Sequence, residues 1–117
     1  MKRDSSADSH KRLRHIEQAI ERIEKYEMNE NESSFDANLI VQDAVLFQFT
    51  VIGEAIQHVE DDILMKYDHP WYKVRSFRNL IAHEYFNIKM SAVWQIIVKD
   101  LPGLKEQLLK ILTKEFS

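Results

Sequence analysis

The sequence predicts an all-α protein, an up-and-down bundle of four to five helices, on the basis of three observations. The chain of 117 residues contains only two glycines and two prolines, whereas β-rich folds need many such residues between short strands. Hydrophobic residues make up 44% of the chain, which is enough for one core. They recur at steps of three and four, the spacing of amphipathic helices. We expect a single domain over residues 1–117, with residues 1–8 flexible.

The first half of the chain predicts two amphipathic helices. The first runs from about Ser9 to Met28. Its apolar stripe consists of Leu13, Ile16, Ile20 and Ile23. Ser34 is a suitable N-cap for a longer second helix that continues to about Lys66. Gly53 lies inside that helix, where glycine costs about 1 kcal/mol relative to alanine. Either a close helix crossing requires this glycine or the helix tolerates it.

The second half predicts two or three further helices. The segment Asp68-His69-Pro70 ends the pattern, because proline disfavours helical geometry in the residue before it. A new helix can begin at Trp71. Its apolar stripe consists of Trp71, Val74, Phe77, Leu80 and Ile81. Ser91 is the predicted N-cap of the next helix, and Pro102 should kink or restart it. The short connections favour antiparallel neighbours.

Composition limits the environment in which the protein works. Cysteine is absent, so disulfides and thiolate metal sites are excluded and a cytoplasmic location is expected. The N-terminal residues contain no apolar stretch that could serve as a secretory signal. The most apolar stretch, Leu39 to Leu64, is interrupted by Gln, Asp and Glu, so we expect no membrane-spanning segment and no membrane partner.

The net charge of −3 is unevenly distributed along the chain. Residues 1–64 contain 7 Lys and Arg against 14 Asp and Glu, whereas residues 65–117 contain 9 against 5. A polyanion would therefore meet the C-terminal half, near Lys73, Arg75 and Arg78. The alternative is that these charges only solvate the outer faces of helices.

The segment from Ser76 to Phe86 combines a permanent cation, an imidazole and a phenol within eight residues. RNA cleavage without a metal requires a 2′-hydroxyl to be deprotonated, a 5′-oxygen to be protonated and charge on the phosphorane to be stabilised. Histidine suits the proton transfers, and arginine suits the phosphate. The candidate catalytic residues are therefore Arg78, Asn79 and His83. An arginine and a histidine five residues apart also occur on helix surfaces that have no chemical role.

Helical geometry separates these candidates. At about 100° per residue, His83 lies about 140° around the helix from Arg78, whereas Asn79 shares a face with His83 and Tyr85 shares one with Arg78. Either the chain turns back near His83, or a second copy of the helix completes the site across a two-fold axis. We favour the homodimer, because its two histidines could serve as base and acid.

The pattern Arg-x4-His-x-Tyr at residues 78–85 resembles the signature of the HepT-like branch of the HEPN superfamily. The matching surroundings are Val51-Ile52-Gly53-Glu54-Ala55, His69-Pro70-Trp71, Val93-Trp94 and Asp100-Leu101-Pro102. The resemblance implies a helical-bundle dimer that cleaves RNA, either tRNA or mRNA, without a metal or other cofactor, as the toxin of a toxin–antitoxin pair. It also implies a partner resembling the MntA-type minimal nucleotidyltransferase, which would inactivate the toxin by transferring AMP to Tyr85. The family pattern further suggests that Glu54 supports the site from the neighbouring helix.

Two alternatives remain. The chain could be a non-catalytic HEPN module that binds a nucleotidyltransferase or a nucleotide. This alternative rests on the overall acidity and on Glu84, which lies where relatives often have glycine and whose carboxylate would repel RNA. The second alternative is a metal site at Glu54 and His58 with the acidic segment Glu60-Asp61-Asp62. No second histidine lies at ligand spacing, so we expect no metal there.

Overall fold

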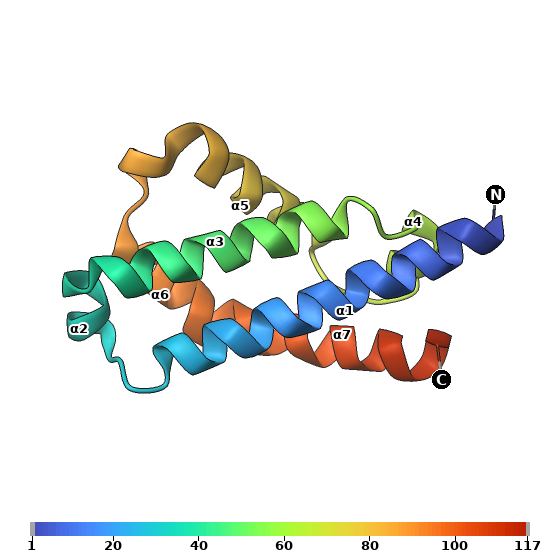
Figure 1. The fold of residues 1–117 in the computed structure, drawn as a ribbon, viewed down its shortest axis with the longest axis horizontal. Helices are drawn as coiled ribbons and strands as arrows, with labels where there is room; N and C mark the ends of the chain where they lie inside the picture. The colour runs from blue at the N-terminus through green and yellow to red at the C-terminus, as the bar shows by residue number, and fades with distance from the viewer. Residues whose placement is uncertain (1, 117) are drawn as a thin grey trace.

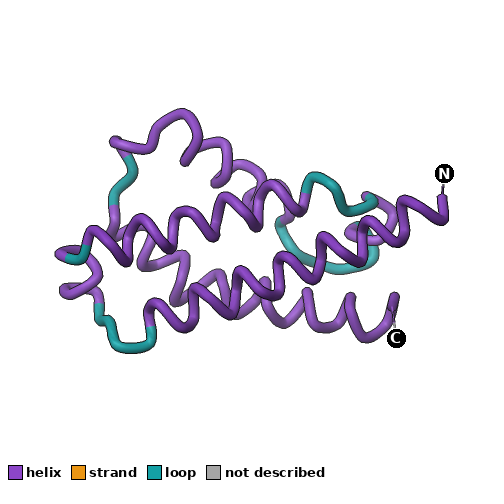
Figure 2. The backbone as a smooth tube through the Cα atoms, in the orientation of Figure 1, coloured by secondary structure: helices purple, strands orange, loops and turns teal. Residues whose placement is uncertain are grey.

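Four long helices dominate the computed structural model (Figure 1). They are α1 (Lys2–Glu27), α3 (Leu39–Ile56), α5 (Trp71–Glu84) and α7 (Leu101–Phe116). The structure describes the backbone of residues 2–116 and the side chains of residues 6–116. Over that range the chain contains helices and loops and no strand (Figure 2). The prediction of an all-α bundle is confirmed.

Three of the long helices, α1, α3 and α7, pack together, and α5 lies outside them (Figure 1). Helix α1 runs antiparallel to both α3 and α7, while α5 lies across the outer side of α3 (Figure 1). The backbone is helical from Lys2 onward. Met1 lies outside the described residues, and the flexibility expected for residues 1–8 stays a prediction.

Short helices connect the long ones. They are α2 (Glu32–Ala37), α4 (Asp61–Leu64), a 3-10 turn η1 (Tyr85–Asn87), α6 (Met90–Gln95) and a π-helical turn η2 (Ile96–Asp100). Helices α6, η2 and α7 follow one another without a loop, so the break expected at Pro102 takes the form of a π-helical turn just before it. Proline lacks the N–H of the regular helical bond and crowds the preceding turn. The wider π turn accommodates both effects.

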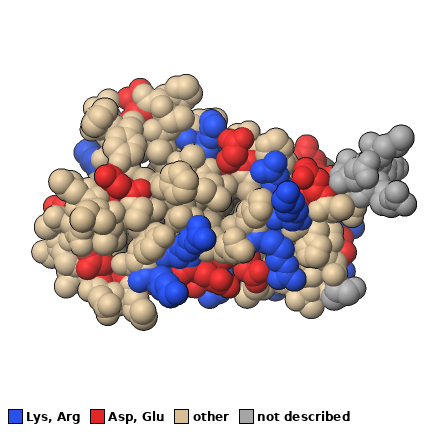
Figure 3. All heavy atoms as spheres, in the orientation of Figure 1, with Lys and Arg blue, Asp and Glu red and all other residues tan. Residues whose placement is uncertain are grey.

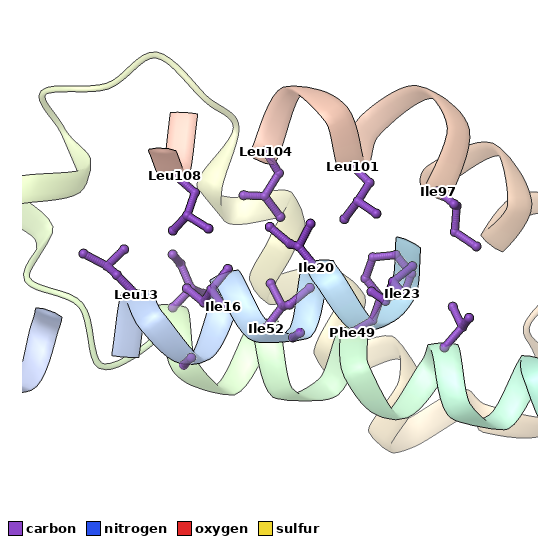
Figure 4. Packing of buried hydrophobic residues seen from close by; sticks show 14 of the residues in the cluster. Leu13, Ile16, Ile20, Ile23, Phe49, Ile52, Ile97, Leu101, Leu104 and Leu108 are labelled. Carbon is purple, nitrogen blue, oxygen red and sulfur yellow. The ribbon is translucent and has the colours of Figure 1, made fainter. Parts of the chain in front are cut away.

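The buried side chains meet between α1, α3 and α7 (Figure 4). The predicted stripe of α1 is at most 1% exposed at each of its four positions. Its side chains point toward Phe49 and Ile52 of α3 and toward α7. The α7 residues that they meet are Leu101, Leu104 and Leu108. Burying each such side chain contributes about 1.5–3 kcal/mol. Helix α5 adds only Ile81 to the fully buried set, and its predicted apolar residue Leu80 is 44% exposed.

The single helix predicted from Ser34 to about Lys66 is wrong, because the chain breaks there into α2, α3 and α4. The first break is at Asn38, whose side chain accepts a hydrogen bond from the Val41 N–H at 3.2 Å and so caps α3. Ser34 is the third residue of α2 rather than its N-cap. Asn31 is the N-cap, and it exchanges bonds of 2.8 and 2.9 Å with Ser34 in a capping box.

The periodicity of apolar residues conceals these breaks because residues on both sides of them reach the same core. Phe35 before α3, and Val59 and Ile63 after it, are all buried. The buried amide of Gln42 donates to the carbonyl oxygens of Phe35 and Asp36, both at 2.9 Å. The bond to Asp36 pairs a carbonyl group at the end of α2, while the Phe35 carbonyl also accepts from the backbone N–H of Asn38 at 3.2 Å.

The predicted N-cap at Ser91 is also wrong. Helix α6 begins one residue earlier, at Met90, and its N-cap Lys89 makes no side-chain hydrogen bond. The helix is instead continuous with η2 and α7, and its buried residue Val93 anchors it in the core.

Helix α3 is the most apolar of the long helices. Its 18 residues have a mean hydropathy of 1.5, so by length and composition alone it could cross a membrane. Gln, Asp and Glu interrupt this helix, but the expectation that no run approaches the length and hydropathy of a membrane span is wrong. The expectation of no membrane partner stays a prediction. Half of this helix is buried inside the protein, where it packs between α1 and α5. A central helix of a bundle has this composition because several neighbours cover it.

Candidate active site

Helix α5 crosses α3 at Gly53, and this crossing positions Arg78. A Cβ atom placed on Gly53 would overlap the Cβ of Arg78 and would lie 2.8 Å from its Cγ. It would also lie 3.2 Å from the carbonyl oxygen of Val74. Only glycine allows so close an approach between a backbone and a neighbouring side chain. Of the two explanations for Gly53, the structure supports the close crossing.

The guanidinium of Arg78 is held by two neighbours. One terminal nitrogen lies 2.9 Å from a carboxylate oxygen of Glu54, on α3. The other donates to the side-chain oxygen of Asn79 at 3.3 Å. The Nε atom is buried and has no hydrogen-bond partner among the described residues. Because the Arg78 side chain is 30% exposed, its cation is oriented by α3 and remains accessible to an anion from solvent.

His83 lies apart from this cluster. It is exposed in the last turn of α5, and it forms no hydrogen bond or ion pair with any residue in the described part of the chain. Helix α5 packs on α3 through the side that carries Arg78. Asn79 and His83 are both exposed. One protomer therefore brings Arg78 and Glu54 together and leaves His83 outside, a separation that the helical spacing predicts. The bond from Arg78 to Asn79 is not predicted by that spacing, which places Asn79 on the face of His83.

Tyr85, the first residue of η1, lies on the same side of α5 as Arg78. Its hydroxyl donates a hydrogen bond to the carboxylate of Asp43 on α3. The pKa of Tyr85 is raised, first by this hydrogen bond, then by burial and by the negative charge of Asp43. The side chain is 38% exposed, and its ring packs edge-on against that of Phe86, with centroids 5.4 Å apart. The hydroxyl therefore lies at the edge between α3 and the end of α5.

Three other residues considered from the sequence contact different neighbours. Arg75 pairs with Asp61 at 3.3 Å. Lys73 lines a cavity of about 350 Å³ between α3, α5 and the start of α7. Glu84 accepts a hydrogen bond from the Asn87 amide at 2.8 Å. None of the three contacts Arg78 within the part of the chain that the structure describes.

Glu54 also lies 3.7 Å from His58, which follows the end of α3 by two residues. Among residues 6–116, no third histidine or carboxylate completes a group that could hold a metal ion. The contacts of Glu54 therefore orient a guanidinium and an imidazole, and its role as a supporting residue of the site stays a prediction.

Asp43 is the residue that the sequence reasoning missed. It lies 11 residues before Glu54, which is three helical turns and places both carboxylates on one face of α3. Because α5 runs antiparallel to α3 (Figure 1), Arg78 meets Glu54 and Tyr85 meets Asp43. Two carboxylates at this spacing in an otherwise uncharged helix were a usable signal.

Charge on the visible face of the molecule is mixed. Figure 3 shows Lys and Arg beside Asp and Glu over α1 and near the α3–α5 crossing, while the end around α2 is largely uncharged. The basic surface expected near Lys73, Arg75 and Arg78 is thus partly neutralised, since Asp61 and Glu54 pair with the two arginines. An RNA phosphate would have to compete with Glu54 for the Arg78 guanidinium.

For the RNA cleavage that the resemblance implies, we expect Glu54→Gln to separate binding from catalysis. Removing the carboxylate takes one negative charge from the site, so the KM for RNA should fall by about threefold at low salt. The looser guanidinium should lower kcat by about tenfold, since small errors in position are costly in catalysis. Steady-state kinetics with a fluorescent RNA would measure both values. Stability should change by less than about 1 kcal/mol, because the ion pair is partly exposed. A variant with unchanged kcat would show that Glu54 does not position Arg78.

Known proteins resemble this chain over most of its length. Residues 16–111 match the family described as "Ribonuclease HepT-like". The "Gamma-glutamylcyclotransferase and putative RNase" of Methanocaldococcus jannaschii is 37% identical over 101 residues, which cover 86% of this chain and 46% of that relative. The chain thus spans about half the length of this two-activity protein. No solved structure gives a significant match.

Two shorter relatives match along nearly their whole length. A "Putative RNase" of Methanocaldococcus jannaschii is 30% identical, over 91% of this chain and 94% of its own. The "Probable ribonuclease HepT" of Thermococcus cleftensis is 30% identical, over 85% of this chain and 91% of its own. With the helical bundle and the Arg-x4-His-x-Tyr segment on α5 and η1, these matches show that the chain belongs to the HepT-like ribonuclease family of the HEPN superfamily.

Proposed function

We propose that this protein is a metal-independent endoribonuclease that serves as the toxin of a toxin–antitoxin pair. The proposal rests on the contacts and exposure of two side chains of α5. Its Arg78 is oriented by Glu54 and Asn79 yet accessible to solvent, and its His83 is exposed without a partner among the described residues. A cation fixed for phosphate and an imidazole free to exchange protons are what this reaction requires.

The proposed reaction is an internal transesterification of RNA. The ribose 2′-oxygen attacks the adjacent phosphorus while one His83 imidazole takes the 2′-hydroxyl proton. The bond from phosphorus to the 5′-oxygen breaks, and a second imidazole protonates that oxygen. The products are a 2′,3′-cyclic phosphate and a 5′-hydroxyl. Arg78 stabilises the charge that develops on the phosphorane, and Asn79 orients His83 or the ribose.

A homodimer would supply the second imidazole. The outer side of α5 and η1 supports this assembly, because it exposes large apolar side chains next to His83. Leu80 is 44% exposed and Phe86 96%. Two copies of this surface facing each other across a two-fold axis would bring the two motif helices together. Stable interfaces of this kind bury about 1,200 Å² or more in total.

We expect Phe86→Asp to convert the dimer into a monomer. The double variant with Leu80→Asp and Phe86→Asp should be fully monomeric. Its dimer would bury four like charges against one another. Light scattering after size-exclusion chromatography at micromolar concentration would measure the mass. The fold should persist, since both side chains are exposed. A wild-type protein that is monomeric under these conditions would contradict the two-fold site.

We further propose that AMP transfer to Tyr85 by a minimal nucleotidyltransferase of the MntA type inactivates the enzyme. The Tyr85 hydroxyl lies on the side of α5 that carries Arg78, and the residue is 38% exposed. An attached AMP would cover the surface on the Arg78 side of α5, and its phosphate would compete for Arg78. Tyr85→Phe should therefore retain nuclease activity and escape inactivation by the partner with ATP.

Incubation with RNA in EDTA tests the proposal most directly. Total tRNA or messenger RNA, incubated with the purified protein and excess EDTA, should yield fragments that end in 2′,3′-cyclic phosphate, detected by mass spectrometry. Intact RNA at high protein concentration, with RNA retained on the protein or a nucleotidyltransferase bound to it, would favour the non-catalytic module. The ion pair between Arg78 and Glu54 favours the non-catalytic module, because an RNA phosphate would have to compete with Glu54 for the guanidinium.

A further inference from the structure

The hydrogen bond from the Tyr85 hydroxyl to Asp43 indicates how Tyr85 could be modified. We propose that Asp43 orients the Tyr85 hydroxyl and accepts its proton when a nucleotidyl group is transferred to it. This role deepens the AMP transfer proposed above and rests on it. Asp43 would be the residue of this chain that makes Tyr85 a better acceptor than other exposed tyrosines.

The geometry selects Asp43 among the charged groups near Tyr85. Asp43 is on α3, the helix packed against α5, and it accepts the hydrogen bond of the Tyr85 hydroxyl. Two charged residues of α5 itself have other partners: Glu84 accepts a hydrogen bond from Asn87, and Arg78 is paired with Glu54 on α3. The proton of the hydroxyl therefore points at one carboxylate, and the oxygen lone pairs remain free for attack.

The chemistry of a phenol explains why such a base is needed. A tyrosine has an ordinary pKa of about 10, and the pKa of Tyr85 is raised further by its surroundings, so the phenolate is scarce near neutral pH. The neutral hydroxyl must lose its proton as it attacks. The Tyr85 oxygen forms a bond to the α-phosphorus of a nucleoside triphosphate, the bond from that phosphorus to the bridging oxygen breaks, and pyrophosphate leaves. The proton passes to Asp43.

The same carboxylate should promote attack on a simpler phosphorus electrophile, which allows a test without the partner enzyme. Diisopropyl fluorophosphate forms a Tyr–O–P bond as fluoride leaves. Tyr72 provides an internal reference, since it is 65% exposed and has no hydrogen-bond partner for its hydroxyl among the described residues. Mass spectrometry of peptides would give the labelling rates of Tyr85 and Tyr72 in the same sample.

We expect Tyr85 of the wild-type protein to react at least about tenfold faster than Tyr72 at pH 7, and Asp43→Asn to remove this difference. The amide can still accept the hydrogen bond but cannot take the proton. Between pH 7 and 9 the wild-type rate should vary little, whereas the rate in Asp43→Asn should rise about tenfold per pH unit because it depends on phenolate. Equal rates and equal pH profiles in the two proteins would overturn the role of Asp43.

A second arm uses ATP with the cognate nucleotidyltransferase. We expect AMP incorporation into Asp43→Asn to be about 100-fold slower than into the wild type. Asp43→Ala, which loses both orientation and base, should be at least as slow. If the wild-type chain accepts no AMP, the proposed switch fails, and this role fails with it. If the wild type and Asp43→Asn accept AMP equally fast, only the role of Asp43 fails.

Discussion

Replacing His83 with alanine should abolish RNA cleavage and leave the fold intact. General acid–base catalysis contributes about 10²–10⁴-fold for each proton transfer, and the two-fold site uses this residue for both transfers. We therefore expect a loss of at least about 10³-fold in kcat, with KM changed by less than about threefold, because phosphate binding rests on Arg78. Single-turnover cleavage of a labelled RNA in EDTA would measure the loss.

The exposure of His83 makes this variant a clean test of catalysis. The side chain is exposed and makes no hydrogen bond or ion pair with a described residue, and substitutions at such surface positions usually change stability by less than about 0.5 kcal/mol. The melting temperature and the dimer mass should match those of the wild type. His15→Ala on α1 removes a half-buried imidazole far along the chain from the motif. It controls for the loss of a histidine and should cleave RNA normally. Undiminished cleavage by folded His83→Ala protein would remove His83 from the mechanism.

Much of the fold and part of the site can be predicted from the sequence because they depend on local spacing. The stripe of α1 and the helix beginning at Trp71 follow directly from apolar periodicity. The separation of Arg78 from His83 follows from 100° per residue, and the structure shows the two on different sides of α5. These features need no knowledge of how the helices pack against one another.

The remaining features depend on tertiary contacts, which a single sequence does not specify. The break at Asn38 is stabilised by the amide of Gln42, which reaches back to the end of α2. The importance of Asp43 depends on the register between α3 and α5, which brings Tyr85 to it. Lys73, selected for its charge, lines a cavity instead of joining Arg78. In each case the side chain type was visible in the sequence and its neighbour was not.

The register between α3 and α5 also makes Gly53 the most sensitive backbone position of the site. Gly53→Ala would place a methyl group into the Cβ of Arg78 and close to the Val74 carbonyl oxygen. Neither is the flexible end of a side chain, so α5 must move away from α3. Overpacking of this kind costs about 1–3 kcal/mol, and the gain in helix propensity from alanine returns at most about 1 kcal/mol. Moving α5 would also displace Arg78 from Glu54.

We therefore expect Gly53→Ala to lower the melting temperature by about 3–8 °C and kcat by about 100-fold, measured where the variant is still fully folded. Gly103→Ala is the matched control, because a Cβ there meets nothing within 4 Å and α7 should gain up to about 1 kcal/mol. Differential scanning calorimetry and single-turnover cleavage of the two variants would separate loss of the crossing from any general effect of replacing a helical glycine. If Gly53→Ala matched Gly103→Ala in both measurements, the close crossing would not be what positions Arg78.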